Sequence, residues 1–205
     1  SATGDANLKN DSMNTAIVGV PFLPKKRVLF EEATGTWCGW CPRGMIYMDS
    51  LWKLHQNDVC ITSVHNGGSD PMKNDNNSAK KYDGLIASLV GGFPSMVVDR
   101  TTETDPSNAF SAYNVFKDLF GYVNIGVTAT YTGSAVNATA TVQPALDLTG
   151  DYRLEFFITE DDVVGSGTGW SQTNYYAPGG PGNSTSMKNA KYNFNILPSP
   201  ASGLS

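Results

Sequence analysis

The chain has few charged residues and no long apolar run, and both shortages limit its function. Only 16% of its 205 residues are charged and the formal net charge is −5, so no basic stripe is present and we expect no nucleic-acid partner. No run of 18 apolar residues occurs, so we expect no transmembrane span. The hydrophobic content of 40% is ample for a core, and we expect two domains. Abundant Ser, Thr, Asn, Gly and Tyr with few charges are typical of an exported protein.

Cysteine and histidine are also scarce, with three and two copies. Three cysteines cannot all pair within one chain, which excludes a disulfide scaffold. Cys38 and Cys41 form a C-x-x-C motif, which is also half of many zinc sites. Zinc would need two more ligands, and the remaining Cys60, His55 and His65 form no second motif. A redox pair is the favoured interpretation, followed by a structural disulfide; we expect no metal and no cofactor beyond the pair itself.

The motif lies in Trp37-Cys38-Gly39-Trp40-Cys41-Pro42, between an apolar strand and a helical pattern that begins at the proline. Unpaired backbone N–H groups and the helix dipole favour an anion at this junction. The pKa of the Cys38 thiol is therefore expected below the ~8.5 of a free cysteine. Cys38 is the candidate nucleophile. Cys41, one turn on, is close enough to form a disulfide with it and is the candidate resolving thiol.

Two polar residues flank this junction. Glu32 interrupts the apolar strand before the motif. It is either an edge carboxylate in water or a buried acid beneath the dithiol, whose raised pKa would let it carry protons during exchange. A helix over 42–56 and a buried strand over 59–64 follow, with Cys60 expected to be a small buried hydrophobe. A right-handed parallel crossover would bring His65 to the sheet edge that carries Cys38, either as a site residue or as the start of a polar loop.

The next segment alternates between helices and one strand. Ser78 is expected to cap a helix with an apolar face from Tyr82 to Leu89. Phe93-Pro94 then precedes a strand over 95–100, and Asp105-Pro106 starts a third helix.

From Tyr122 the hydrophobic period changes to two. Alternating strands are predicted over 123–131, 136–142 and 152–158, which indicates an antiparallel, sandwich-like (immunoglobulin-like) domain. Three strands are too few for a sandwich, so we expect part of that domain to lie outside this chain. The predicted division is 1–24 as a tether with a short strand over 16–20, 25–121 as an α/β domain, and 122–205 as the β domain. Aromatic residues in its Gly-rich end are predicted either to bind a glycan or partner or to close over the sandwich: Trp170, Tyr175, Tyr176 and Tyr192.

From about Arg27 to Gly121 the chain resembles the thioredoxin superfamily. Glu32 matches the buried acid of thioredoxins, and Phe93-Pro94 resembles their cis-proline loop, which faces the dithiol and pairs with substrate. The resemblance therefore implies a cis Phe93–Pro94 bond packed against Cys38. Residues 29–44, with Val64-His65-Asn66-Gly67 and Gly92-Phe93-Pro94-Ser95 and a trailing β domain, are similar to the outer-membrane-protein-28-related family of exported bacterial proteins. That similarity implies a periplasmic, outer-membrane or cell-surface location and allows a lipid anchor upstream of Ser1.

Three departures qualify the resemblance. Thioredoxins have a hairpin after the cis-proline, and here only one strand is predicted before the next helix. No lysine occupies the thioredoxin position near Ser63, and Gly39-Trp40 lacks the cationic histidine of strongly oxidising relatives. The direction of electron flow is thus open.

Two hypotheses about function follow. The first is a cell-envelope thiol–disulfide oxidoreductase acting on protein thiols or disulfides, with Cys38, Cys41 and Glu32 as catalytic residues. Its substrate-binding residues would be Trp37, Trp40, Phe93 and Pro94, with His65 beside them. The second is a surface-exposed binding or adhesion lipoprotein in which the disulfide is structural and the β domain binds the partner.

Overall fold

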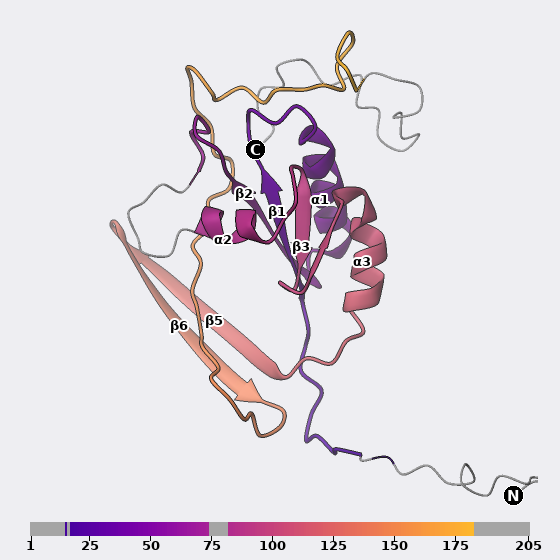
Figure 1. Cartoon of the computed structure of the whole chain (residues 1–205). Coiled ribbons are helices and arrows are strands. Elements are labelled where there is room, and N and C mark those ends of the chain that lie inside the picture. The colour runs from indigo at the N-terminus through magenta and orange to yellow at the C-terminus, as the bar shows by residue number, and fades with distance from the viewer. Residues whose placement is uncertain (1–14, 16, 74–81, 183–205) are drawn as a thin grey trace, which may run out of the picture. The chain divides into compact units, whose positions relative to one another are not determined.

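The computed structural model describes residues 15, 17–73 and 82–182. Within them the chain forms two compact units (Figure 1). One comprises residues 26–119 together with 153–182, and the other comprises residues up to 25 together with 120–152. Each unit is described by itself below.

The larger unit is built on a four-stranded mixed sheet of order β2-β1-β3-β4. Strand β1 (Val28–Thr34) pairs in parallel with β2 (Val59–His65), and helix α1 (Pro42–His55) connects them. Strand β3 (Ser95–Val98) is antiparallel to β1, and β4 (Thr102–Thr104) is antiparallel to β3. Because β1 is central, the residues that follow it emerge in the middle of one sheet edge.

Helices cover both faces of this sheet, as the burial of β1 along nearly its whole length requires. Phe30 of β1 lies in the main core with α1 and with α3 (Ala109–Phe116), which follows a short 3-10 turn, η2 (Pro106–Asn108). Ala33, on the opposite face, packs with Val64 against α2 (Tyr82–Ser88). Figure 1 shows α1 and α3 on one side of the sheet and α2 on the other. The predicted helix after the motif and the parallel crossover are confirmed; Ser78 lies outside the described residues.

Two predictions for this unit are wrong. The hairpin after the proline loop is present, because β4 follows β3 through a tight turn at Asp99 and Arg100. Both residues have positive φ, 46° and 53°. Gly or Asn usually marks such a turn in a sequence, and neither is present here, so the sequence pattern does not predict this turn. Cys60 is exposed rather than buried. Strand β2 is an edge strand, and α2 is too short to cover its whole outer face.

The smaller unit is a hairpin rather than a sandwich. Strands β5 (Val123–Thr132) and β6 (Ala135–Pro144) pair antiparallel along their full length, in a register that matches Val123 with Pro144. The alternation predicted for these two strands therefore places apolar residues on one face. Residues 17–20, where a short strand was predicted, are not in a strand.

The third strand predicted over 152–158 is also absent. Phe157 packs on the larger unit, because its ring lies 4.7 Å from the ring of Tyr82 and 5.3 Å from the Arg100 guanidinium carbon. The apolar residues that alternate in this segment are exposed instead, so their period of two does not mark a strand: Tyr152, Leu154, Phe156 and Ile158.

A buried ion pair lies under that contact. Glu31 of β1 is fully buried and accepts hydrogen bonds from Arg100 Nε and Nη2, the latter at 2.9 Å. The Tyr82 hydroxyl donates to the same carboxylate at 2.5 Å. Burial, followed by the interaction with Glu31, raises the pKa of Tyr82 above its usual range, so this hydroxyl stays a donor.

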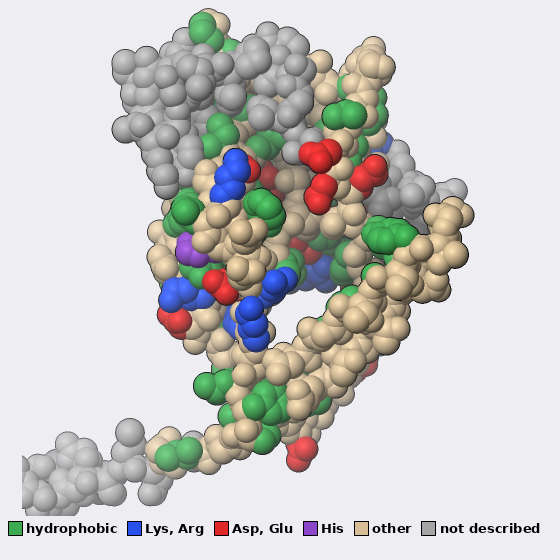
Figure 2. All heavy atoms as spheres, turned by 180° about the vertical axis from the view of Figure 1, so that it is seen from behind, with side chains coloured by type: hydrophobic (Ala, Val, Ile, Leu, Met, Phe, Trp, Pro, Cys, Tyr) green, Lys and Arg blue, Asp and Glu red, His purple; other side chains and the backbone are tan. Residues whose placement is uncertain are grey.

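Charged residues of both signs are mixed on the surface. On the face drawn in Figure 2, Lys and Arg side chains lie among those of Asp and Glu.

Replacing Arg100 should destabilise the fold by leaving the Glu31 carboxylate without a cation. We expect Arg100→Met to lower the free energy of unfolding by about 3 kcal/mol, the lower end for a broken buried pair, because Arg100 is itself partly exposed. Adding Glu31→Gln should recover part of the loss. Denaturant titration measures both, and Lys53→Met, which breaks an exposed pair with Asp49, should cost under about 0.5 kcal/mol. Equal losses for Arg100→Met and Lys53→Met would contradict the assignment.

Candidate functional site: a disulfide at the edge of the sheet

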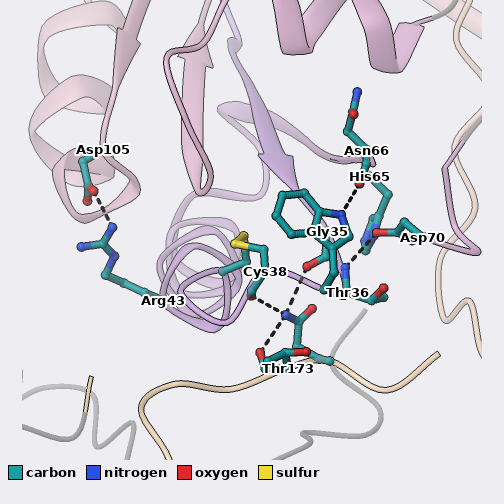
Figure 3. The surroundings of a disulfide bond; sticks show 12 residues. Gly35, Thr36, Cys38, Arg43, His65, Asn66, Asp70, Asp105 and Thr173 are labelled. Atoms are coloured by element: carbon teal, nitrogen blue, oxygen red, sulfur yellow. Dashed lines mark hydrogen bonds and ion pairs between the residues drawn. A yellow bond between two sulfur atoms is a disulfide. The ribbon is translucent and has the colours of Figure 1, made fainter. Parts of the chain in front are cut away.

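The Cys38–Cys41 pair is joined as a disulfide in the loop between β1 and α1, with the Cα atoms 5.4 Å apart. The loop closes on itself, since Cys38 N donates to Gly35 O and Cys41 N donates to Cys38 O. Pro42 starts α1 directly afterwards. Cys38 is 4% exposed and Cys41 is fully buried, so Cys38 is the more accessible of the two. Figure 3 shows Cys38 and the residues that surround the disulfide. The roles of Cys38 as nucleophile and Cys41 as resolving thiol stay predictions.

Trp37 joins the disulfide loop to two neighbouring loops. Its indole Nε1 donates to Asn66 O at 2.6 Å, and its ring lies 5.6 Å from that of Phe93. The side chain is nevertheless 45% exposed. Trp37 of the disulfide loop thus forms an aromatic pair with Phe93, in which Trp37 is exposed and Phe93 is partly buried. Their role in substrate binding stays a prediction.

The Phe93–Pro94 peptide bond is cis, as predicted. A Cβ built on Gly44, in the first turn of α1, would lie 3.2 Å from Pro94 Cβ, which places the proline beside the helix that follows the disulfide. An open depression of about 340 Å³ borders this loop and is lined by residues 92–95 and 103–105. Contact of the proline ring with the Cys38 sulfur stays a prediction.

Glu32 is fully buried, as predicted. Its Oε2 accepts a hydrogen bond from Ser63 Oγ at 3.0 Å, and its Oε1 has no hydrogen-bond partner among the described residues. A Cβ on Gly44 would approach Oε1 to 2.0 Å, so the carboxyl lies against the helical turn that follows Cys41. Burial raises the pKa of Glu32 to about 8, against the lowering effect of Ser63. At neutral pH this side chain is therefore mostly a neutral acid.

His65 reaches the edge that carries the disulfide, where the parallel pairing aligns it with Thr34, but its contact is with Asp70. Its Nδ1 donates to Asp70 Oδ2 at 2.9 Å, and the same oxygen accepts from Thr36 N at 2.8 Å. Burial would raise the pKa of Asp70, but the bonds from His65, Met72 N and Thr36 N outweigh it and hold the pKa below its ordinary value. His65 is thus part of a brace that fixes the start of the disulfide loop.

A second brace comes from residues 172–176, which we call the strap. Thr173 N donates to Thr36 O at 2.7 Å and Tyr175 N donates to Gly39 O at 2.8 Å. The side-chain Nε2 of Gln172 donates to Cys38 O at 2.8 Å (Figure 3). More than 130 residues separate the strap from the loop, and no motif in the sequence signals the contact.

The strap also accounts for Trp40. Its ring packs edge-on against Tyr175 and Tyr176, at 5.4 and 5.5 Å between centroids, and Tyr176 belongs to the main core. A Cβ on Gly39 would lie 2.4 Å from the Tyr175 ring, so this close approach requires glycine within the motif. Trp40 therefore packs against the strap and the main core rather than against Trp37 and Phe93.

Among the described residues, no group of three or more His, Cys, Asp and Glu side chains is arranged to hold a metal ion. No helix in the same part of the chain is both long and apolar enough to cross a membrane. The chemistry that the site itself offers is exchange at the disulfide, with a neutral buried acid nearby.

Comparison with known proteins finds similarity only among solved structures. No protein-family model and no curated protein matches the sequence. HBP35 of Porphyromonas gingivalis is 22% identical with a TM-score of 0.48, over 62% of this chain and 45% of that one. Protein AGR_C_4864 from Agrobacterium tumefaciens is 20% identical with a TM-score of 0.39, over 54% of each chain. This chain thus spans about half the length of either structure.

The raised pKa of Glu32 predicts that stability depends on pH. The unfolded pKa is near 4.5 and the folded pKa is about 8, so the folded state binds more protons between these values. The free energy of unfolding should therefore fall as pH rises from about 4.5 to about 8, by up to ~1.4 kcal/mol per pH unit from this group. Denaturant titrations across this range should show that Glu32→Gln removes that component of the slope. Parallel curves for the wild-type protein and Glu32→Gln would contradict a buried neutral Glu32.

Proposed function

We propose that the protein is a thiol–disulfide oxidoreductase with a thioredoxin-like domain. The observation that carries the proposal is the disulfide between a slightly exposed Cys38 and a buried Cys41 at the start of a helix, beside a buried acid and a cis-proline loop. The parallel pairing of β1 with β2 and the β3–β4 hairpin that follows the cis-proline, a feature of thioredoxins, support the proposal.

In the reducing direction, the Cys38 thiolate attacks one sulfur of a substrate disulfide, and the other substrate sulfur leaves as a thiolate. Cys41 then attacks Cys38 in the mixed disulfide, which releases the second substrate sulfur and re-forms the Cys38–Cys41 bond. Two electrons pass from the protein to the substrate. In the oxidising direction the same steps run backwards through the same mixed disulfide.

Glu32 is suited to handle the proton of Cys41. When the disulfide opens, the Cys41 sulfur is released as a thiolate at a site with no access to water. Glu32, a neutral acid that lies against the adjoining turn of α1, can give this sulfur a proton and take one back when Cys41 attacks. With a pKa of about 8, Glu32 is protonated often enough at pH 7 to do the first and can ionise readily enough to do the second.

The substrates that fit this site are protein thiols or disulfides. Trp37 offers an exposed aromatic surface next to the partly buried Phe93, and the depression beside the cis-proline offers room for an extended peptide. A cell-envelope location is part of the proposal and is supported by the exported-type composition and by the resemblance. An oxidising compartment would keep the pair as the disulfide.

The rival proposal is a binding or adhesion lipoprotein with a structural disulfide. The specific observation that favours it is the low exposure of the pair, at 4% and 0%, together with the two braces that hold its loop. Turnover separates the two proposals.

Exchange with a fluorogenic disulfide peptide is the decisive measurement. We expect Cys38→Ser to abolish turnover, because no nucleophile remains, and Cys41→Ser to accumulate a mixed disulfide visible by mass spectrometry. Cys60→Ser is the matched control, since Cys60 is free and exposed, and it should turn over like the wild-type protein. If the wild-type protein turns over no faster than Cys38→Ser, the pair is structural.

A further inference from the structure

The side-chain amide of Gln172 has a defined orientation. Its Nε2 lies 2.8 Å from Cys38 O, 3.2 Å from Gly35 O and 3.0 Å from Thr173 O. All three neighbours are carbonyl oxygens, which only accept hydrogen bonds, so the NH₂ end must face them. The positive end of the amide dipole therefore points at the backbone of the disulfide motif.

Packing alone does not explain this residue. Gln172 is 1% exposed, and its Oε1 is buried without a hydrogen-bond partner in the described part of the chain. A buried polar atom without a partner costs free energy, and an apolar side chain of similar length would fill the site without that cost. The two N–H groups of the amide, shared among three carbonyl oxygens, therefore contribute something that an apolar residue would not.

The strap adds two further N–H groups to the same loop, from Thr173 to Thr36 O and from Tyr175 to Gly39 O. The positive ends of three donor groups thus gather on the segment that carries Cys38. Reduction of the disulfide places a negative charge on the Cys38 sulfur, and nearby N–H dipoles favour that charged form. The disulfide carries no such charge, so the donors act on the reduced state more than on the oxidised one.

We propose that Gln172 is a positioning residue of the dithiol, which acts through the Cys38 backbone to favour the reduced form with a Cys38 thiolate. The equilibrium concerned converts the protein disulfide and two glutathione thiols into the protein dithiol and glutathione disulfide. Two electrons pass to the protein, and one proton is released when Cys38 remains a thiolate. The proposal rests on the proposed function only in requiring a reversible pair.

Two measurements on Gln172→Met test this, because methionine keeps the length of the side chain and removes the donors. The pH dependence of alkylation of the reduced protein should show a higher pKa for Cys38. Equilibration with glutathione should shift about tenfold toward the disulfide, equivalent to a potential lower by ~30 mV. Gln172→Asn, whose amide is one methylene short, should shift both quantities less. Gln143→Met, on the exposed surface of β6, is the matched control and should shift neither.

The outcomes distinguish the alternatives. If Gln172→Met lowers the unfolding temperature but leaves the Cys38 pKa and the glutathione equilibrium unchanged, Gln172 is only a brace and the proposal is wrong. A shift toward the dithiol would overturn it as well. If Gln172→Met does not fold, the milder Gln172→Asn still decides by the same two quantities. Both are measured with glutathione alone, so a protein that turns over no peptide disulfide would refute the proposed function and leave this test intact.

Discussion

The site depends on how closely other groups approach the backbone of the disulfide loop. At Gly44 a Cβ would come within 2.0 Å of the Glu32 carboxyl, and at Gly39 within 2.4 Å of the Tyr175 ring. The buried acid and the strap can therefore reach the loop only because these two positions lack a side chain. Gly44 sits inside α1, where glycine costs about 1 kcal/mol relative to alanine, and the helix tolerates that cost at the point where the acid needs the space.

Two adjacent glutamates in β1 differ in their interactions because successive side chains of a strand point to opposite faces of the sheet. Glu31 faces α2, where Arg100 and the Tyr82 hydroxyl supply donors to both of its oxygens. Glu32 faces α1, where Ser63 donates a hydrogen bond to it and burial raises its pKa to about 8. The first stabilises the fold and anchors the extended segment around Phe157 through Arg100. The second is mostly a neutral acid at neutral pH, beside the helical turn that follows the disulfide.

Local patterns predicted the parts of the molecule that depend on neighbouring residues. The strand, motif and helix around Cys38, the parallel crossover and the burial of Glu32 follow from apolar periodicity and from Pro42. The hairpin turn at Asp99 is not predicted by the sequence pattern, because its residues adopt positive φ angles without a glycine to mark the turn. Residues 152–158 alternate as a strand would, yet they form no strand, and their alternating apolar side chains are exposed. The strap is held by hydrogen bonds to a loop more than 130 residues away, which no local pattern predicts.

The strap extends the folded unit that holds the disulfide. A boundary at residue 121 follows the change of hydrophobic period, yet the main core includes Tyr176, and the carbonyl of Cys38 accepts a bond from Gln172. The segment up to residue 119 therefore contains the sulfurs, the acid and the cis-proline, but lacks one core aromatic residue and the donors on the loop. Since Thr36 N donates to Asp70 and Thr36 O accepts from Thr173, both backbone groups of this loop residue are held. The conformation of the loop consequently depends on residues 26–119 and 153–182 together, although the motif itself is only six residues long.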